Sequence, residues 1–234
     1  MIDLHCHILP AIDDGPAHLA ESLEMARMAV ADGVDTIVAT PHVKELPYPA
    51  ERIPGQVETF RQALQAAQIP LNILPGADVS ALLEPTQLAP FTLNTTPYLL
   101  FEFPHSHVPQ NAGQLVFNAI MAGLKPIITH PERNPSFMRQ PQLLFDLVEA
   151  GALVQLTADS LTGGFGADAR ECALHILRRK QAHFLASDAH SSQRRRPGLS
   201  QAVAEAAQVI GKKAALKLVL DHPAAVLAGR ELAD

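Results

Sequence analysis

The sequence has little cysteine, with two residues in 234. Two cysteines cannot form the disulfide framework that stabilises small secreted proteins. No apolar run approaches the roughly 18–20 residues that a membrane-spanning helix needs. The first residues also lack the basic, apolar and small-residue segments of a secretory signal. These absences predict a cytoplasmic protein that does not insert into a membrane.

Positive charge is also scarce, because 18 Lys and Arg stand against 24 Asp and Glu, for a net charge of −6. An acidic balance of this kind argues against nucleic acid or an anionic membrane as a partner. The sequence also lacks the glycine fingerprint of dinucleotide-binding folds. Apolar residues make up 47% of the chain, which is typical of a globular protein. With no repeat or low-complexity linker, residues 1–234 are predicted to form a single domain.

Short apolar segments alternate with amphipathic ones along the chain. The predicted strands are 2–7, 36–39, 71–79, 98–103, 125–129, 152–156 and 182–186. The predicted helices are 17–31, 50–67, 110–122, 142–150, 167–179, 199–210 and 212–220, with a last turn after Pro223. Residues 84–96 are predicted to be irregular, and 163–166 to be a flexible loop. Seven βα units of this kind favour a closed α/β barrel over a doubly wound sheet.

The first predicted strand ends in His5-Cys6-His7. Residues i and i+2 of a strand point to the same face, so His5 and His7 would aim both imidazoles at one place. Cys6 would point the other way and be buried. Two converging imidazoles with carboxylates close behind suggest a divalent metal ion.

Potential ligands follow six of the seven predicted strands, and barrel enzymes carry their chemistry at these C-terminal ends. The predicted metal ligands are His5, His7, Asp14, His42, Asp78, Glu102, His130, Asp188 and His190. Nine ligands are too many for one ion, so Asp78 and Glu102 are predicted to bridge two or three ions. Mixed imidazole and carboxylate ligands suit manganese, iron or zinc better than calcium, and the sequence does not choose among the three.

Closely spaced divalent ions indicate hydrolysis by a metal-bound hydroxide. Two arginines lie near the predicted ligands in sequence: Arg133 follows His130, and Arg196 follows His190. A guanidinium fork fits phosphate oxygens, so both are predicted to bind a phosphoryl group. The neighbouring Arg194 and Arg195 are predicted to be solvated surface charges.

These motifs resemble the PHP superfamily, named for polymerase and histidinol phosphatase. Within it the chain looks like the bacterial capsule and exopolysaccharide branch of metal-dependent protein-tyrosine phosphatases. The matching segments are 1–7, 13–16, 39–42, 76–78, 101–103, 129–133, 161–166 and 187–190. The Asp-Asp-Gly-Pro and His-Pro-Glu-Arg segments, at 13–16 and 130–133, are the branch-specific ones.

The resemblance implies a distorted (β/α)7 barrel, three metal ions that are often manganese, and hydrolysis of phosphotyrosine. The implied substrate is a bacterial tyrosine autokinase that controls polysaccharide export. The nine ligands and the two arginines named above carry over onto the family's motifs. One departure is Asp78, where this branch commonly has Glu, so the spacing or choice of ions would differ. The oligomeric state stays open.

Other interpretations remain. A histidinol-phosphate phosphatase or a general phosphoesterase of the same superfamily would use the same ions, and a non-catalytic regulatory protein would keep them without turnover. Cys172 and Arg178 match the C-x5-R pattern of cysteine-dependent phosphatases, but the segment lacks glycine and predicts a helix with Cys172 packed. His105 and His107 are predicted to be rim residues, and 163–166 a mobile flap over the site.

Overall fold

The computed structural model describes residues 1–46 and 48–232. Its strands are short, apolar and parallel, as expected for a sheet covered by helices. Their bounds are β1 Ile2–Cys6, β2 Thr36–Ala39, β3 His42–Val43, β4 Asn72–Pro75, β5 Asp78–Ser80, β6 Tyr98–Glu102, β7 Lys125–Thr129, β8 Leu153–Thr157 and β9 Phe184–Ala186.

Two hydrogen-bonded sheets have the strand orders β1-β2-β4 and β3-β5-β6-β7-β8-β9. β2 continues into β3 and β4 into β5, with two residues between the members of each pair. Backbone hydrogen bonds cross these interruptions, from Gly76 N to Ala39 O at 3.1 Å and from Asp78 N to Pro41 O at 3.1 Å. Each pair is therefore one bent strand, and the predicted strand 71–79 is observed over residues 72–80 with an interruption at residues 76 and 77.

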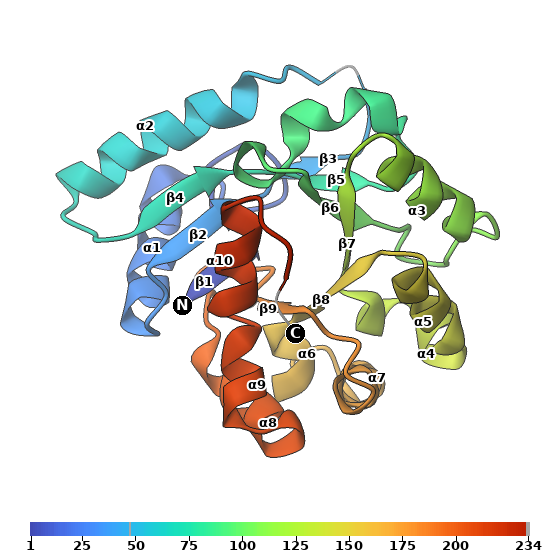
Figure 1. Cartoon of the computed structure of the whole chain (residues 1–234). Helices are drawn as coiled ribbons and strands as arrows, with labels where there is room; N and C mark the ends of the chain where they lie inside the picture. The colour runs from blue at the N-terminus through green and yellow to red at the C-terminus, as the bar shows by residue number, and fades with distance from the viewer. Residues whose placement is uncertain (47, 233–234) are drawn as a thin grey trace.

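The first strand closes the barrel against the segment that follows the last. Asp188 N donates to His5 O at 2.8 Å, and His7 N donates to Ala189 O at 2.8 Å. Counting β2–β3 and β4–β5 as one strand each, the described part of the chain forms a ring of seven parallel strands with helices outside (Figure 1). The predicted distorted (β/α)7 barrel is confirmed, and the two bent strands are its distortion.

A register shift lies in β1 between Asp3 and Cys6, where the pairing with β2 slips. Leu4 packs with the apolar side chains inside the barrel, while Cys6 belongs to the cluster beneath the helices. Without the slip, Leu4 and Cys6 would share a face, because side chains alternate along a strand. Because of this irregularity, β1 can place Leu4 in the packed interior of the barrel and the imidazoles of His5 and His7 at its C-terminal end.

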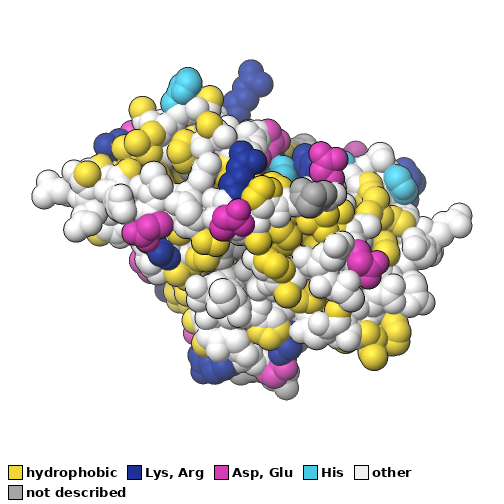
Figure 2. Space-filling view, turned by 90° about the horizontal axis from the view of Figure 1, so that it is seen from above, with side chains coloured by type: hydrophobic (Ala, Val, Ile, Leu, Met, Phe, Trp, Pro, Cys, Tyr) yellow, Lys and Arg dark blue, Asp and Glu magenta, His cyan; other side chains and the backbone are white. Residues whose placement is uncertain are grey.

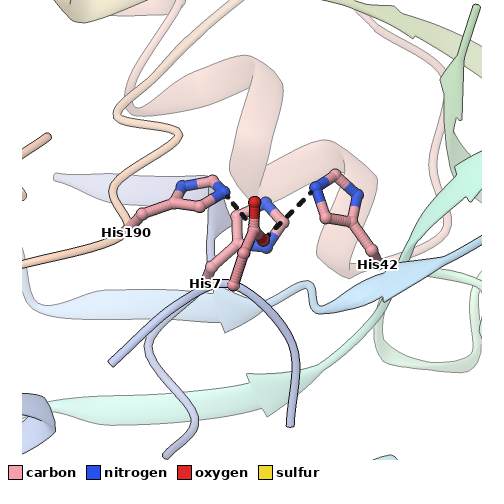
Figure 3. Close-up of side chains that lie close together, drawn as sticks. His7, His42 and His190 are labelled. Carbon is pink, nitrogen blue, oxygen red and sulfur yellow. Dashed lines mark ion pairs between the residues drawn. The ribbon is translucent and has the colours of Figure 1, made fainter. Parts of the chain in front are cut away.

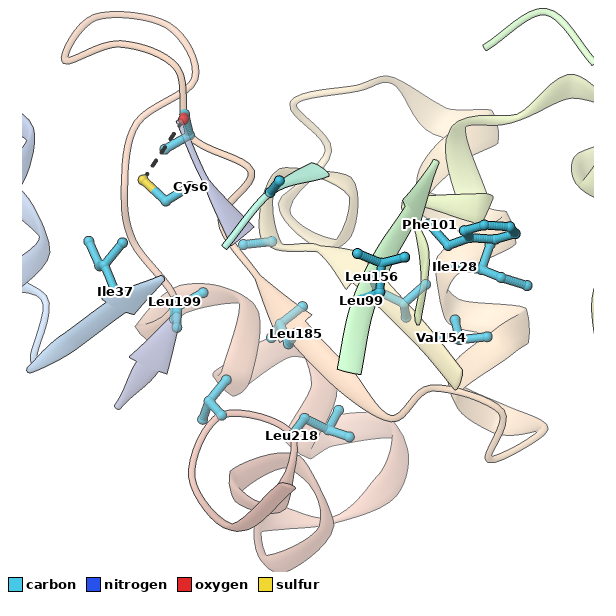
Figure 4. Packing of buried hydrophobic residues seen from close by; sticks show 14 of the residues in the cluster. Cys6, Ile37, Leu99, Phe101, Ile128, Val154, Leu156, Leu185, Leu199 and Leu218 are labelled. Atoms are coloured by element: carbon cyan, nitrogen blue, oxygen red, sulfur yellow. Dashed lines mark hydrogen bonds between the residues drawn. The ribbon is translucent and has the colours of Figure 1, made fainter. Parts of the chain in front are cut away.

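The core has two parts. The larger cluster fills the space between the outer faces of the strands and the helices, and Figure 4 shows Ile37, Leu99, Phe101 and other members of it. The smaller cluster fills the barrel interior and joins β1, β2, β6, β7 and β9 to α10 through Val226. The barrel is therefore packed with side chains, and α10 lies across the end shown in Figure 1.

Most helices lie where the sequence predicts them. They are α1 Leu19–Ala31, α2 Arg52–Ala66, α3 Ala112–Met121, α4 Pro135–Arg139, α5 Gln142–Glu149, α6 Ala158–Thr162, α7 Ala167–Arg178, α8 Ser200–Ile210, α9 Lys212–Lys217 and α10 Asp221–Leu227. The short helices α4 and α6 were not predicted. The irregular stretch 84–96 contains the 3₁₀ turns η1 Pro85–Gln87, η2 Ala89–Phe91 and η3 Leu93–Thr95, and η4 Pro131–Arg133 follows β7.

No helix in the described residues is long and apolar enough to cross a membrane. On the side shown in Figure 2, acidic and basic side chains are interspersed among polar and hydrophobic ones. That side therefore presents no broad band of one charge. The absence of nucleic acid and the cytoplasmic location stay predictions.

His183 makes the stability of the fold depend on pH. Its ring lies before β9, and its Nδ1 accepts the backbone N–H of Val154 at 3.1 Å, which requires an unprotonated nitrogen. Burial and the nearby His222 lower the pKa of His183 to about 4. A folded-state pKa below the unfolded value gives stability that is complete above the unfolded pKa and is lost as pH falls through the folded one.

We therefore expect His183 to cost the fold about 2 kcal/mol between pH 8 and pH 5, because the unfolded chain binds a proton there that the folded chain refuses. His183→Asn keeps an acceptor for Val154 but does not titrate, so its unfolding free energy should fall less over that range. Urea unfolding of metal-stripped protein at each pH measures this, with the exposed His18→Asn as control. Equal pH dependence in wild type and His183→Asn would contradict the expectation.

Candidate metal centre

All nine predicted ligands lie at the C-terminal ends of the strands and converge on one region. Together with His105, they form four overlapping groups whose nitrogen and oxygen atoms lie within 4.8 Å of one another in each group. The groups are His7, Asp14, His42 and His190; His5, His7 and Asp188; His42, Asp78 and Glu102; and Glu102, His105 and His130. The predicted convergence is observed, and the binding of ions stays a prediction.

His5 and His7 have their Nε2 atoms 3.1 Å apart. The Nδ1 of His7 donates to Asp13 Oδ2 at 2.7 Å, and the Nδ1 of His5 donates to Gln155 Oε1 at 2.9 Å. In neutral rings both Nε2 atoms therefore carry lone pairs that face each other. Asp188 Oδ1 lies 3.4 Å from His5 Nε2 and 3.6 Å from His7 Nε2. Two lone pairs and a carboxylate directed at one point are the ligand set of a divalent cation.

Asp78 and Glu102 stand between the groups. Asp78 Oδ2 lies 3.5 Å from His5 Nε2 and 3.4 Å from His42 Nδ1. Glu102 Oε2 lies 3.4 Å from His42 Nδ1, and Glu102 Oε1 lies 3.5 Å from His130 Nε2. Each carboxylate thus reaches histidines of two groups, which is the geometry that the predicted bridging role requires.

The third part of the centre surrounds Asp14. Asp14 Oδ1 lies 3.6 Å from His42 Nε2 and 3.4 Å from His190 Nε2, and the rings of His7 and His190 have centroids 3.8 Å apart. Figure 3 shows His7, His42 and His190 turned toward one another. Gly15 lets the loop fold back over β1, because a Cβ there would lie 2.4 Å from the carbonyl oxygen of His7.

The electrostatics of these groups favour cations. Both carboxylate oxygens of Asp78 are buried without a hydrogen-bond partner, as are Glu102 Oε1 and His190 Nε2, among the described side chains. Burial lowers the pKa of His7 well below its usual value, so the ring is neutral. Burial opposes protonation of His42, but Asp78 and Glu102 outweigh it and raise the pKa of His42 to about 10. A buried polar atom without a partner is costly, and cations at these positions would satisfy all of them.

Two side chains that were not among the predicted ligands, Asp13 and Gln155, orient ligands of the centre. Asp13 accepts from His7 Nδ1 and also from His42 N at 3.0 Å, so one carboxylate orients two ligands. Gln155 orients His5 from β8. In the sequence, the Asp13-Asp14 pair and a glutamine within an apolar strand were the features that could have indicated these two residues. His105 lies at the rim as predicted, with its side chain 62% exposed and its Nε2 3.2 Å from Glu102 Oε1.

The arginine prediction needs one correction. Arg133 lies beside the centre and donates from Nη1 to Asp188 Oδ2 at 2.5 Å. Arg196 is exposed and donates from Nε to Gln193 O at 2.9 Å, so it does not reach the centre. Arg195, predicted to be solvated, instead places Nη2 2.5 Å from the same oxygen of Asp188.

The reason for this exchange is the turn after His190. His190 N and Ser191 N both donate to Arg195 O, at 2.9 and 3.1 Å, which fixes the backbone so that the side chain of Arg195 points inward. The side chain of Arg196, the next residue, then points outward.

Cys172 is packed in α7, as predicted. Burial raises the pKa of its thiol to about 12, which rules against a thiolate nucleophile. Cys6 is fully buried on the face away from the histidines, and burial raises its pKa as well.

Comparison with known proteins identifies the family. Residues 1–228 match the model of the capsular polysaccharide synthesis family CpsB/CapC. The chain belongs to the CpsB/CapC family. The tyrosine-protein phosphatase YwqE of Bacillus subtilis (strain 168) is 44% identical over 197 residues, which are 82% of this chain and 78% of YwqE.

The fold of this CpsB/CapC chain matches solved structures as well. It superimposes with a TM-score of 0.94, at 37% identity, on a chain from the crystal structures of YwqE from Bacillus subtilis and CpsB from Streptococcus pneumoniae, described as unique metal-dependent tyrosine phosphatases. The match covers 100% of this chain and 96% of that one. Histidinol phosphate phosphatase from Lactococcus lactis gives a TM-score of 0.56 at 14% identity, covers 91% of this chain and 93% of that one, and shares the fold alone.

Asp13→Asn should lower the affinity of this CpsB/CapC chain for divalent ions by about 10-fold, because a neutral amide is a weaker acceptor for His7 Nδ1 than a carboxylate. Metal content after equilibration with limiting manganese, measured by mass spectrometry, tests this without relying on activity. Asp168→Asn changes an exposed carboxylate on α7 and serves as control. Wild-type metal content in Asp13→Asn would contradict the assignment.

Arg195→Ala should weaken inhibition by inorganic phosphate by about 10-fold or more, because it removes a charged hydrogen-bond donor from the site. Arg196→Ala is the matched control, one residue away on the same turn, and should stay within about twofold of wild type. Inhibition constants of the metal-loaded enzyme measure both. A larger effect at Arg196 than at Arg195 would restore the original assignment.

Proposed function

We propose that this chain is a metal-dependent protein-tyrosine phosphatase that hydrolyses phosphotyrosine monoesters. One observation carries the proposal: two guanidinium groups meet at Asp188 Oδ2, at the edge of a buried cluster of imidazoles and carboxylates. The cluster suits divalent cations, and the guanidiniums suit the oxygens of a phosphoryl group. The YwqE relative and the matched crystal structures carry tyrosine phosphatase names, which supports the same activity here.

Divalent ions bound in the cluster would supply Lewis acidity and an activated water to attack phosphorus. The chain's own residues then have separate roles. Arg133 and Arg195 hold phosphoryl oxygens and orient the ester. Asp13 holds His7, and Gln155 holds His5, in the tautomer whose proton is on Nδ1 and whose Nε2 has a free lone pair.

The proposal includes two or three ions, with manganese first and iron or zinc as alternatives. Three separate places support this number: between His5 and His7, around Asp14, and between Asp78 and Glu102. His5, His7, Asp14, His42, Asp78, Glu102, His130, Asp188 and His190 are the proposed ligands. Mixed nitrogen and oxygen donors fit these three metals.

The proposed substrate is a phosphotyrosine protein, namely a bacterial tyrosine autokinase that regulates capsule or exopolysaccharide synthesis. Support comes from the family, whose model describes capsular polysaccharide synthesis. The proposal treats residues 1–234 as one catalytic domain acting in the cytoplasm.

Activity on a phosphotyrosine peptide should exceed activity on histidinol phosphate when both are assayed side by side with defined manganese. A chelator should abolish both activities and added manganese should restore them, because bound ions would activate the attacking water. Cys172→Ser should stay within about twofold of wild type, since Cys172 packs on a helix away from the ions. Preference for histidinol phosphate would support the rival phosphatase, and metal binding without turnover would support a regulatory protein.

A further inference from the structure

Phe165 lies in the turn that joins α6 to α7. Gly163 and Gly166 flank it with φ values of 93° and 89°, which residues with a side chain rarely adopt. Gly164 N donates to Asp159 O at 2.8 Å, and Gly166 N donates to Gly163 O at 3.0 Å. These two hydrogen bonds shape the turn that carries the half-buried ring of Phe165, and the mobility of residues 163–166 stays a prediction.

The ring of Phe165 covers the two arginines of the site. Its centroid lies 4.2 Å from Cζ of Arg133 and 5.8 Å from Cζ of Arg195. These guanidiniums come from segments far apart in the chain, after β7 and after β9, and both reach Asp188 Oδ2. One phenyl ring and one carboxylate oxygen therefore hold two positive charges together.

The carboxylate of Asp188 and the ring of Phe165 differ in whether they occupy the N–H groups of the arginines. Asp188 directs Oδ1 to His5 and His7, and its Oδ2 occupies N–H groups of both arginines. A phenyl face attracts a cation through its quadrupole but provides no carboxylate to occupy the N–H groups. An acidic side chain in its place would pair with the arginines and compete with the substrate phosphate.

We propose that Phe165 is a positioning residue that holds Arg133 and Arg195 ready for phosphoryl oxygens. The inference rests on the proposed function only in that the bound group is a phosphoryl group. The Gly163–Gly166 turn then contributes to substrate binding through the face of the Phe165 ring. A ring of the same kind should therefore replace Phe165, and an aliphatic side chain of similar size should not.

The test compares Phe165→Leu and Phe165→Tyr in metal-loaded protein. Affinity for inorganic phosphate is measured by titration calorimetry, and KM and kcat are measured with p-nitrophenyl phosphate. Phe165→Leu should weaken phosphate binding and raise KM by roughly 5-fold, with kcat within about twofold, because the loss falls on binding of the phosphoryl group. Phe165→Tyr should restore both to within about twofold of wild type.

Phe145→Leu is the matched control, because the ring of Phe145 lies 5.6 Å from Cζ of Arg179 on the outer helices. It removes the same kind of contact away from the site and should leave phosphate affinity unchanged. Wild-type phosphate affinity in Phe165→Leu, or equal losses in Phe165→Leu and Phe165→Tyr, would overturn the proposal. If wild type binds phosphate but hydrolyses no phosphomonoester, the proposed function fails while the calorimetric comparison still decides the role of Phe165.

Discussion

The buried meeting of His5 Nε2 and His7 Nε2, 3.1 Å apart, is the constraint on which the site depends. Two lone pairs at this distance repel, and the carboxylates of Asp78 and Asp188 beside them add negative charge in a poorly solvated place. Only positive charge balances such a group. The bent strands, the register shift in β1 and the glycine-bearing loop after it all direct ligands into this one volume. The barrel therefore holds buried imidazole nitrogens and carboxylate oxygens close together, although their lone pairs and negative charges repel.

Much of this arrangement could be predicted from the sequence, because two simple rules hold. Side chains alternate along a strand, which correctly separated His5 and His7 from Cys6. Parallel strands of a barrel end on one face, which brought residues as distant as His42 and His130 to the same place. Neither rule needs a side-chain contact, so the nine candidate ligands emerged from strand ends alone.

The errors concern features that depend on local backbone geometry. Arg195 and Arg196 are equivalent in sequence, and only the turn closed by Arg195 O decides which of them faces inward. Asp13 and Asp14 are adjacent in the same way, yet one reaches an imidazole Nδ1 and the other faces His42 and His190 across the centre. The bends between β2 and β3 and between β4 and β5 likewise depend on pairing across the sheet. The spacing of apolar residues in the sequence does not indicate which of these local arrangements forms.

Closure of the barrel joins the first strand to the segment that follows the last strand. His5 and His7 belong to the first strand, whereas Asp188 and His190 follow the last, and backbone hydrogen bonds hold these segments together. During synthesis, the histidines leave the ribosome long before the aspartate that completes their group. A nascent chain therefore exposes a partial and weak ligand set, and the full centre forms only when nearly the whole domain is available to fold. Loading of the full ligand set with metal would in this way wait until Asp188 and His190 have been synthesised.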